Sequence, residues 1–256
     1  MVKSLLRLIW SALASRDLDT RDAARYELVS AVARRMKFRL YDRNLSWHDD
    51  EEFREVMSDF AVRDPFIRDR KFILYSFAQA LVHLRGDTAE CGVYEGRTSH
   101  LMCRAAHGRD PREHHIFDSF DGLSEPTDHD ATTDPTAYQW KKHDLGVPEE
   151  TVRENLKEFE FVKYYAGWIP DRFGEVADRR FSLVHIDVDL YQPTKDAVEF
   201  FYPRLVRGGV IVCDDYGFTT CPGARLACDE YAAELPQRRV IHLSTGQGLL
   251  VRTENT

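Results

Sequence analysis

The sequence has 256 residues, 43% hydrophobic and 30% charged, which suits one α/β domain with an appendage or two small domains around a real core. A net charge of −8 without a basic block argues against nucleic acid and anionic membranes as partners. No run approaches the roughly 20 apolar residues of a membrane span, and five cysteines without a Cys-x-x-Cys pair indicate a reduced, cytoplasmic protein.

Residues 1–85 carry a helical pattern without a strand signal. Apolar side chains recur at helical spacing between Val29 and Leu40, and again along a helix predicted from about Arg70 to Leu84. Asp64-Pro65 marks a break between helices. We expect a helical N-terminal segment that serves as a lid, as an oligomer contact or as a layer covering a sheet.

From residue 86 onward, strand and helix patterns alternate, which predicts an α/β domain with a mostly parallel sheet. Strands are predicted at residues 87–93, 114–118, 161–166, 181–191 and 208–216, and a final β pair at 239–243 and 248–252. Helices are predicted at residues 99–106, 148–159, 194–205 and 222–233.

Two features at the ends of the first two strands suggest a nucleoside-containing ligand. A glycine turn at Gly92 leads into a helix, a geometry that offers free backbone N–H groups to a ligand. Glu90, just inside this buried strand, needs a cation or a donor. Asp118 ends the second strand, where an acid either accepts hydrogen bonds from ribose hydroxyls or caps a turn.

A long polar segment follows the second strand. Residues 124–148 contain three prolines and no apolar periodicity, and we expect them to form a functional lid or to be disordered. Further along, Gly167-Trp168 closes the third strand. That tryptophan either stacks on a base or fixes its own loop.

Four carboxylates end two buried strands that are separated by one helix: Asp187, Asp189, Asp214 and Asp215. Neighbouring parallel strands end at one edge of a sheet, so we expect these acids to lie together. An aspartate after a strand is often a cap or turn residue, but four such anions would repel one another without a cation. Oxygen ligands favour magnesium, calcium or manganese. Asp187 and Asp189 would point the same way on a regular strand.

These motifs, in this order, resemble the macrocin O-methyltransferase (TylF-type) family. The resemblance rests on Glu90–Gly96, Asp118–Leu123, Gly167-Trp168, Asp187–Tyr191 and Asp214–Gly217, and it runs from about Arg70 to Tyr231. It implies a Rossmann-like class I methyltransferase fold with a seven-stranded sheet. It also implies an S-adenosylmethionine-dependent, magnesium-dependent O-methyltransferase acting on a sugar hydroxyl of a natural product. Family members often carry a second glycine where this chain has Glu95-Gly96-Arg97.

The resemblance also implies roles for individual residues. Asp189 would be the catalytic base, and Asp187, Asp214 and Asp215 would bind Mg2+ or another divalent cation. The residues implied to bind S-adenosylmethionine are Glu90, Gly92, Val93, Tyr94, Thr98, Asp118, Ser119, Gly167, Trp168 and Asp187.

Two other classes of function remain open at this point. A metal-dependent hydrolase would use the same carboxylates but would have no use for Asp118 as a ribose acid. A non-catalytic protein of the same fold would bind a small molecule without needing Asp189. The expected partner is a glycoside or sugar that carries the acceptor hydroxyl, and the N-terminal helices are a candidate contact for a homo-oligomer.

Overall fold

The structure is a computed structural model that describes residues 2–39, 50–59, 68–106, 112–236 and 238–253. The chain divides into two compact units, Met1–Arg54 and Glu55–Thr256. The predicted helix break at Asp64-Pro65 lies outside the described residues. Among the described helices, none combines the length and the apolar character that crossing a membrane requires.

The smaller unit is a pair of packed helices, α1 (Val2–Ala14) and α2 (Leu18–Arg35). Asp17 caps α2, because its side chain accepts a hydrogen bond of 2.9 Å from the Thr20 backbone N–H. A further helix, α4 (Glu51–Asp59), crosses the boundary between the two units along the chain.

The larger unit contains a seven-stranded sheet with the strand order β3-β2-β1-β4-β5-β7-β6. The first five strands in this order are parallel, and β7 runs antiparallel to both of its neighbours. This arrangement confirms the predicted fold class, including the final β pair. The strands are β1 (Asp87–Cys91), β2 (His114–Asp118), β3 (Val162–Ala166), β4 (Phe181–Ile186), β5 (Leu205–Cys213), β6 (Ile241–His242) and β7 (Gly248–Val251).

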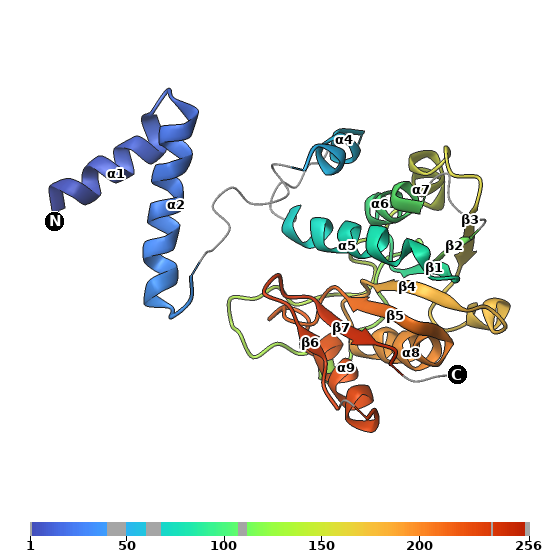
Figure 1. The fold of residues 1–256 in the computed structure, drawn as a ribbon. Coiled ribbons are helices and arrows are strands. Elements are labelled where there is room, and N and C mark those ends of the chain that lie inside the picture. Colours follow the sequence, from blue (N-terminus) through green and yellow to red (C-terminus); the bar gives the residue numbers. More distant parts are fainter. Residues whose placement is uncertain (1, 40–49, 60–67, 107–111, 237, 254–256) are drawn as a thin grey trace. The chain divides into compact units, whose positions relative to one another are not determined.

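Helices cover both faces of this sheet (Figure 1). On one face lie α5 (Arg68–Ala80), α6 (Arg97–Ala106) and α7 (Glu149–Asn155), and on the other lie α8 (Tyr191–Phe201) and α9 (Pro222–Glu234). Short 3-10 turns complete the connections at Leu81–His83, Asp128–Asp130, Phe173–Val176 and Tyr202–Arg204.

The two-sided cover explains why the central strands are apolar throughout. Every residue of β4 is buried. Under α8, Phe181 and Phe201 meet edge to face with ring centroids 5.0 Å apart, and Phe117 lies 5.7 Å from Phe201. Such aromatic contacts contribute roughly 0.5–1.5 kcal/mol each beyond the burial of their area. The core therefore fixes the central strands rigidly and presents their ends as one edge.

At that edge the central strands end level with one another. The register pairs Cys91 with Ile186 and Ile186 with Cys213. The next residues continue the pairing, because Asp187 N–H donates to the Cys91 carbonyl and Asp214 N–H to the Ile186 carbonyl, both at 2.9 Å. Gly92, Asp187 and Asp214 are therefore neighbours across the sheet, as the spacing of the motifs predicted.

The predicted continuation of the fourth strand to Asp189 was wrong. The strand ends at Ile186, and Asp189 has a left-handed backbone with φ of +59°. The chain must turn here because α8 begins at Tyr191, only two residues later. Asp187 and Asp189 therefore do not share one face of a regular strand.

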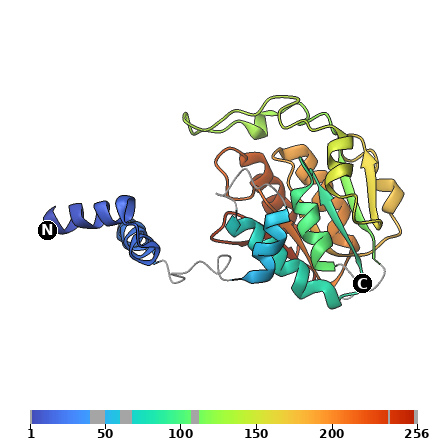
Figure 2. The same cartoon turned by 90° about the horizontal axis from the view of Figure 1, so that it is seen from above.

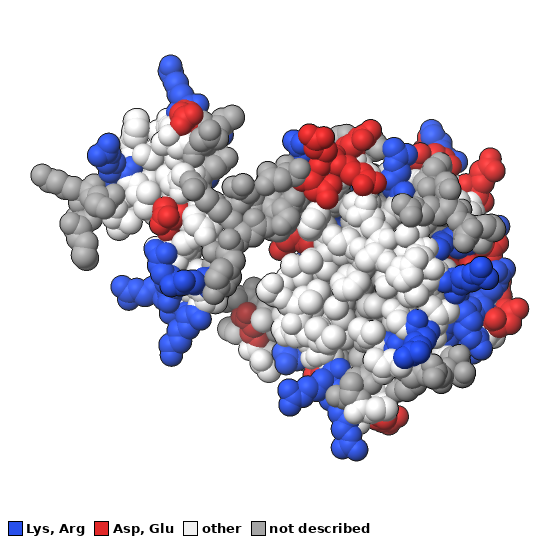
Figure 3. Space-filling view, in the orientation of Figure 1, with Lys and Arg blue, Asp and Glu red and all other residues white. Residues whose placement is uncertain are grey.

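The segment 124–148 extends as a long arm along one edge of the larger unit (Figure 2). Asp130 ties it down, because its carboxylate accepts a hydrogen bond of 2.6 Å from the Tyr191 backbone N–H. On the face of the larger unit that Figure 3 shows, lysine and arginine side chains are interspersed with acidic ones around a broad uncharged area.

Candidate functional site

A cavity of about 460 Å³ opens at the carboxyl edge of the sheet, within the larger unit. This volume is typical of small-molecule sites. Ten of the residues predicted for the site line it: Gly92, Tyr94, Thr98, Asp118, Ser119, Trp168, Asp187, Asp189, Asp214 and Asp215. The ends of the five parallel strands, β1 to β5, thus bring the predicted cofactor and metal residues into one cavity.

Three predicted site residues lie beside the cavity rather than in its lining. Glu90 is fully buried, and its carboxylate contacts the Ser99 hydroxyl and, at 2.8 Å, Nδ1 of His185. Val93 is buried, and Gly167 N–H donates to the Asp118 carbonyl at 2.9 Å. These residues support the wall of the cavity from behind.

The turn after β1 requires glycine at Gly92. Its φ is +77°, and an added Cβ would lie 1.9 Å from the carbonyl oxygen of Asp187. The turn leads into α6, whose second residue, Thr98, faces the cavity. Free N–H groups at the start of α6 therefore lie near this end of the cavity, where they can receive a negatively charged group.

Asp118 holds the glycine turn in place. One carboxylate oxygen accepts a hydrogen bond from Val93 N–H and the other accepts one from Phe120 N–H, both at 2.7 Å. Burial raises the pKa of Asp118 above its ordinary value, although these hydrogen bonds oppose the shift. Each oxygen has a second lone pair, so Asp118 can accept further hydrogen bonds from a ligand.

The four carboxylates follow β4 and β5 at this edge, where Asp187 is half-buried and the other three are buried. Asp189, Asp214 and Asp215 are only 5–8% exposed. Burial, followed by the charge of Asp187, raises the pKa of Asp189 to about 7. Burial, followed by the charges of Asp189 and Asp187, raises the pKa of Asp215 well above its ordinary value. The cluster therefore has an excess of negative charge that a cation would relieve.

Side chains that the sequence analysis missed already compensate part of this charge. The Arg70 guanidinium forms an ion pair with Asp214 and lies 3.9 Å from an oxygen of Asp215. Nε2 of Gln247 donates to Asp214 at 2.6 Å. Both residues reach the cluster from elements distant in sequence, α5 and the β6–β7 turn, and no motif marks them.

The far end of the cavity is closed by a thiol and by the long arm. Sγ of Cys221 lies 3.4 Å from Asp189 and 3.4 Å from Nε1 of Trp140, which belongs to the arm. Burial, followed by the charges of Asp215 and Asp189, raises the pKa of the Cys221 thiol. Cys221 therefore stays protonated and can donate to the Asp189 carboxylate.

The residues that line the cavity fit both ligands that the sequence motifs implied, a divalent cation and a nucleoside-containing cofactor. Asp187 and Asp214 lie close enough to hold a metal ion together with His185, and Asp189 and Asp215 form a second such group with Cys221. The carboxylate oxygens of these groups are ligands that suit a hard divalent cation. The Gly92 turn, Asp118 and Trp168 give the cavity hydrogen-bonding groups and an aromatic side chain, as a nucleoside with a polar tail requires.

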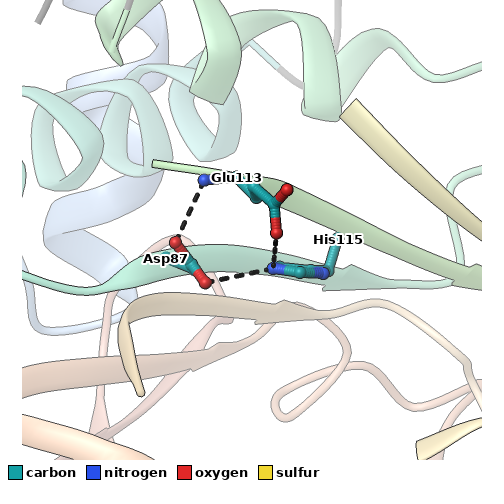
Figure 4. Close-up of side chains that lie close together, drawn as sticks. All are labelled: Asp87, Glu113 and His115. Atoms are coloured by element: carbon teal, nitrogen blue, oxygen red, sulfur yellow. Dashed lines mark hydrogen bonds and ion pairs between the residues drawn. The ribbon is translucent and has the colours of Figure 1, made fainter. Parts of the chain in front are cut away.

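A second cluster of titratable groups lies at the opposite, amino ends of the strands (Figure 4). Nε2 of His115 lies 3.2 Å from Asp87 and 3.9 Å from Glu113. Arg179 pairs with both acids, at 3.4 and 2.7 Å, and Lys163 pairs with Glu113 at 3.5 Å. Because these cations already balance the acids, the cluster is an ion-pair network that joins β1, β2 and β3.

Comparisons with known proteins agree with this geometry. The family model for macrocin-O-methyltransferase (TylF) matches residues 77–240. The 8-demethyl-8-(2,3-dimethoxy-alpha-L-rhamnosyl)-tetracenomycin-C 4'-O-methyltransferase of Streptomyces olivaceus is 33% identical over 149 residues, 54% of this chain and 56% of that protein. The demethyldecarbamoylnovobiocin O-methyltransferase of Streptomyces niveus is 30% identical over 156 residues, 58% of this chain and 59% of that protein.

The solved structure of the O-methyltransferase NovP superposes with a TM-score of 0.60 and 27% identity, covering 72% of this chain and 80% of that chain. The match to the two sequence relatives spans a little over half of their length.

Proposed function

This chain belongs to the macrocin-O-methyltransferase (TylF) family, and on that premise we propose that it methylates a sugar hydroxyl of a glycosylated natural product. The methyl donor is S-adenosylmethionine, and the reaction depends on a divalent cation. The observation that carries this proposal is the shared cavity, in which a glycine turn with Asp118 faces a cluster of four carboxylates. The two sequence relatives are named as O-methyltransferases, one of them for a rhamnosyl-bearing compound.

Residues of the glycine turn and its neighbours hold the cofactor in this proposal. Asp118 accepts hydrogen bonds from the ribose diol, and Trp168 borders the adenine. The rest of the cofactor would contact four further residues that line the cavity: Gly92, Tyr94, Thr98 and Ser119. Glu90 and Val93 act from behind the wall, by fixing the turn.

The carboxylate wall holds the acceptor and removes its proton. Asp187, Asp214 and Asp215 would hold the cation, which would supply Lewis acidity that lowers the pKa of a nearby hydroxyl. Asp189 then accepts the hydroxyl proton. Without a cation, burial and the charge of Asp187 raise the pKa of Asp189 to about 7. A cation held beside Asp189 would lower that pKa and favour the ionised carboxylate that accepts the proton.

The methyl transfer itself is a displacement whose atoms and electrons balance. The acceptor oxygen forms a bond to the methyl carbon while the bond from that carbon to the cofactor sulfur breaks. The hydroxyl proton goes to Asp189, and the products are a methyl ether and S-adenosylhomocysteine. Since positioning supplies much of the rate in such a reaction, the rigid sheet edge beneath both reactants matters.

The arm 124–148 covers the acceptor in this proposal. Its Trp140 lines the cavity and contacts Cys221, and its Leu145 lines the cavity as well. If limited proteolysis cuts this segment equally with and without cofactor and acceptor, it is not a lid.

We also propose that the N-terminal helices form a contact between copies of the chain. The helix α1 supports this, because it exposes several large apolar side chains: Leu5, Leu6, Ile9, Trp10 and Leu13. Light scattering should give the mass of an oligomer for the full chain. A monomeric mass at micromolar concentration would contradict the contact.

The experiment that tests the proposed function is a binding and transfer assay with defined components. Calorimetry should show binding of S-adenosylhomocysteine to the wild type. Radiolabelled S-adenosylmethionine with Mg2+ and a panel of rhamnosides and related glycosides should then yield a labelled glycoside. Cofactor hydrolysis without transfer, or no cofactor binding at all, would contradict the proposal.

A further inference from the structure

Lys71, on α5, is a buried cation that faces the cofactor end of the cavity. Its side chain lines the cavity although the residue is only 8% exposed. Its ammonium has one hydrogen-bond partner among the described residues, the Thr98 hydroxyl at 3.4 Å. A buried ammonium group is stable only with an anion or several acceptors around it, so this site is incomplete by itself.

The carboxylates nearest to Lys71 do not supply the anion that its ammonium group needs. Both oxygens of Glu90 are already engaged, one by Ser99 and the other by His185. Within the described parts of the chain, no carboxylate oxygen lies within 4.0 Å of the Lys71 ammonium. Burial lowers the pKa of Lys71, the charges of Glu90 and Asp187 oppose this shift, and those of Arg97 and Arg70 add to it.

The surroundings of Lys71 define which anion fits. Thr98 is the second residue of α6, a ten-residue helix whose free N–H groups favour a negative charge at this end. Asp187 lines the same cavity and offers a carboxylate to a positive group. A cation and an anion that line one cavity suit a zwitterion, and the free amino-acid end of S-adenosylmethionine carries both an ammonium and a carboxylate.

We propose that Lys71 binds the carboxylate of the methionine end of the cofactor, together with the Thr98 hydroxyl. The inference rests on the proposed function, since it takes S-adenosylmethionine as the ligand. It adds a residue from outside the strand ends, and it makes α5 part of the cofactor site. Cofactor binding then supplies the anion that the buried ammonium lacks.

Two cofactors that differ only in this carboxylate test the role of Lys71. Calorimetry would compare S-adenosylmethionine with decarboxylated S-adenosylmethionine, for the wild type and for Lys71→Met, which keeps the length of the side chain and removes its charge. The wild type should bind the carboxylate-bearing cofactor about 10- to 100-fold more tightly, the usual effect of a hydrogen-bonded charge pair. Lys71→Met should bind the two cofactors with nearly equal affinity.

Lys157→Met is the matched control, because Lys157 is an exposed residue whose loss changes the net charge equally. It should keep the wild-type selectivity. Lys71→Gln serves as a second variant that retains a polar side chain, and thermal unfolding checks the fold of each protein.

The outcomes separate this inference from the proposed function. Undiminished selectivity for the carboxylate in folded Lys71→Met or Lys71→Gln would overturn the role of Lys71 alone. A wild type that binds neither cofactor would overturn the proposed function and this assignment together. An equal loss of affinity for both cofactors in the variants would assign Lys71 a structural role and would also overturn the inference.

Discussion

The backbone N–H of Asp189 donates a hydrogen bond of 3.1 Å to the carboxylate of Asp215. This bond connects the residue proposed as the base with a residue proposed as a cation ligand. It also accompanies the left-handed backbone of Asp189, which turns the chain from the end of β4 into α8. Two carboxylates that would repel each other are thus held close by a bond from the backbone of Asp189 to the side chain of Asp215.

Replacing the proposed base should separate chemistry from cation binding. We expect Asp189→Asn to lose roughly 10²- to 10⁴-fold in turnover, the usual contribution of a general base. The change keeps the backbone bond to Asp215, so the affinity for Mg2+ should stay close to that of the wild type. Single-turnover methyl transfer and calorimetric titration with Mg2+ measure the two quantities, and near-normal turnover would show that Asp189 is not the base.

Arg70 should compete with the cation for the carboxylate cluster. It forms an ion pair with Asp214, so a cation that binds Asp214 and Asp215 must displace or share that guanidinium. We expect Arg70→Gln to bind Mg2+ more tightly and to lose stability without metal, because the acids then lack their cation. By contrast, Asp214→Asn and Asp215→Asn should bind Mg2+ more weakly. Weaker Mg2+ binding by folded Arg70→Gln would contradict the competition.

Asp118 should matter for cofactor affinity through the nucleoside. Replacing the carboxylate in Asp118→Asn keeps its shape but removes one strong acceptor, at a cost of about 1.5–3 kcal/mol of binding free energy. Calorimetry with S-adenosylhomocysteine measures this loss, and adenine as a second ligand controls for a disturbed base pocket. Unchanged affinity for S-adenosylhomocysteine would remove Asp118 from the site.

The acid cluster should make the metal-free protein less stable as the pH rises. Burial and the neighbouring Asp187 raise the pKa of Asp189 from 3.8 to about 7, so the folded state holds this proton more tightly than the unfolded chain does. The stability that this proton provides is complete below about pH 4 and is lost as the pH rises through about 7. In chelator, the melting temperature of the wild type should therefore fall more between about pH 5 and pH 8 than that of Asp189→Asn. Equal falls in the two proteins would show that Asp189 does not carry this proton.

Much of the fold could be predicted because the signals were local. The run Phe181–Ile186 is apolar at every position except Ser182 and His185, and both of these are buried, as expected for a strand covered on both faces. The order of the glycine turn, Asp118 and the paired acids also placed the residues of the cavity at one edge of the sheet.

What could not be predicted depends on distant packing. Arg70 and Lys71 are adjacent in a helix whose apolar pattern was recognised, yet only the docking of α5 onto the sheet edge shows that both reach the cavity. The turn at Asp189 has the same origin, since the start of α8 rather than the strand sequence ends the extended backbone. Glu90 has the burial expected from its strand, but its contacts with Ser99 and His185 follow from tertiary structure.

The most direct test of the proposed function is methyl transfer by the wild type with and without a divalent cation. Labelled S-adenosylmethionine and the glycoside panel would be incubated with the enzyme in Mg2+, in chelator, and in chelator followed by excess Mg2+. We predict a labelled methyl glycoside in Mg2+, none in chelator, and recovery when Mg2+ is restored. Full transfer in chelator would contradict the role of the carboxylate cluster as a cation site.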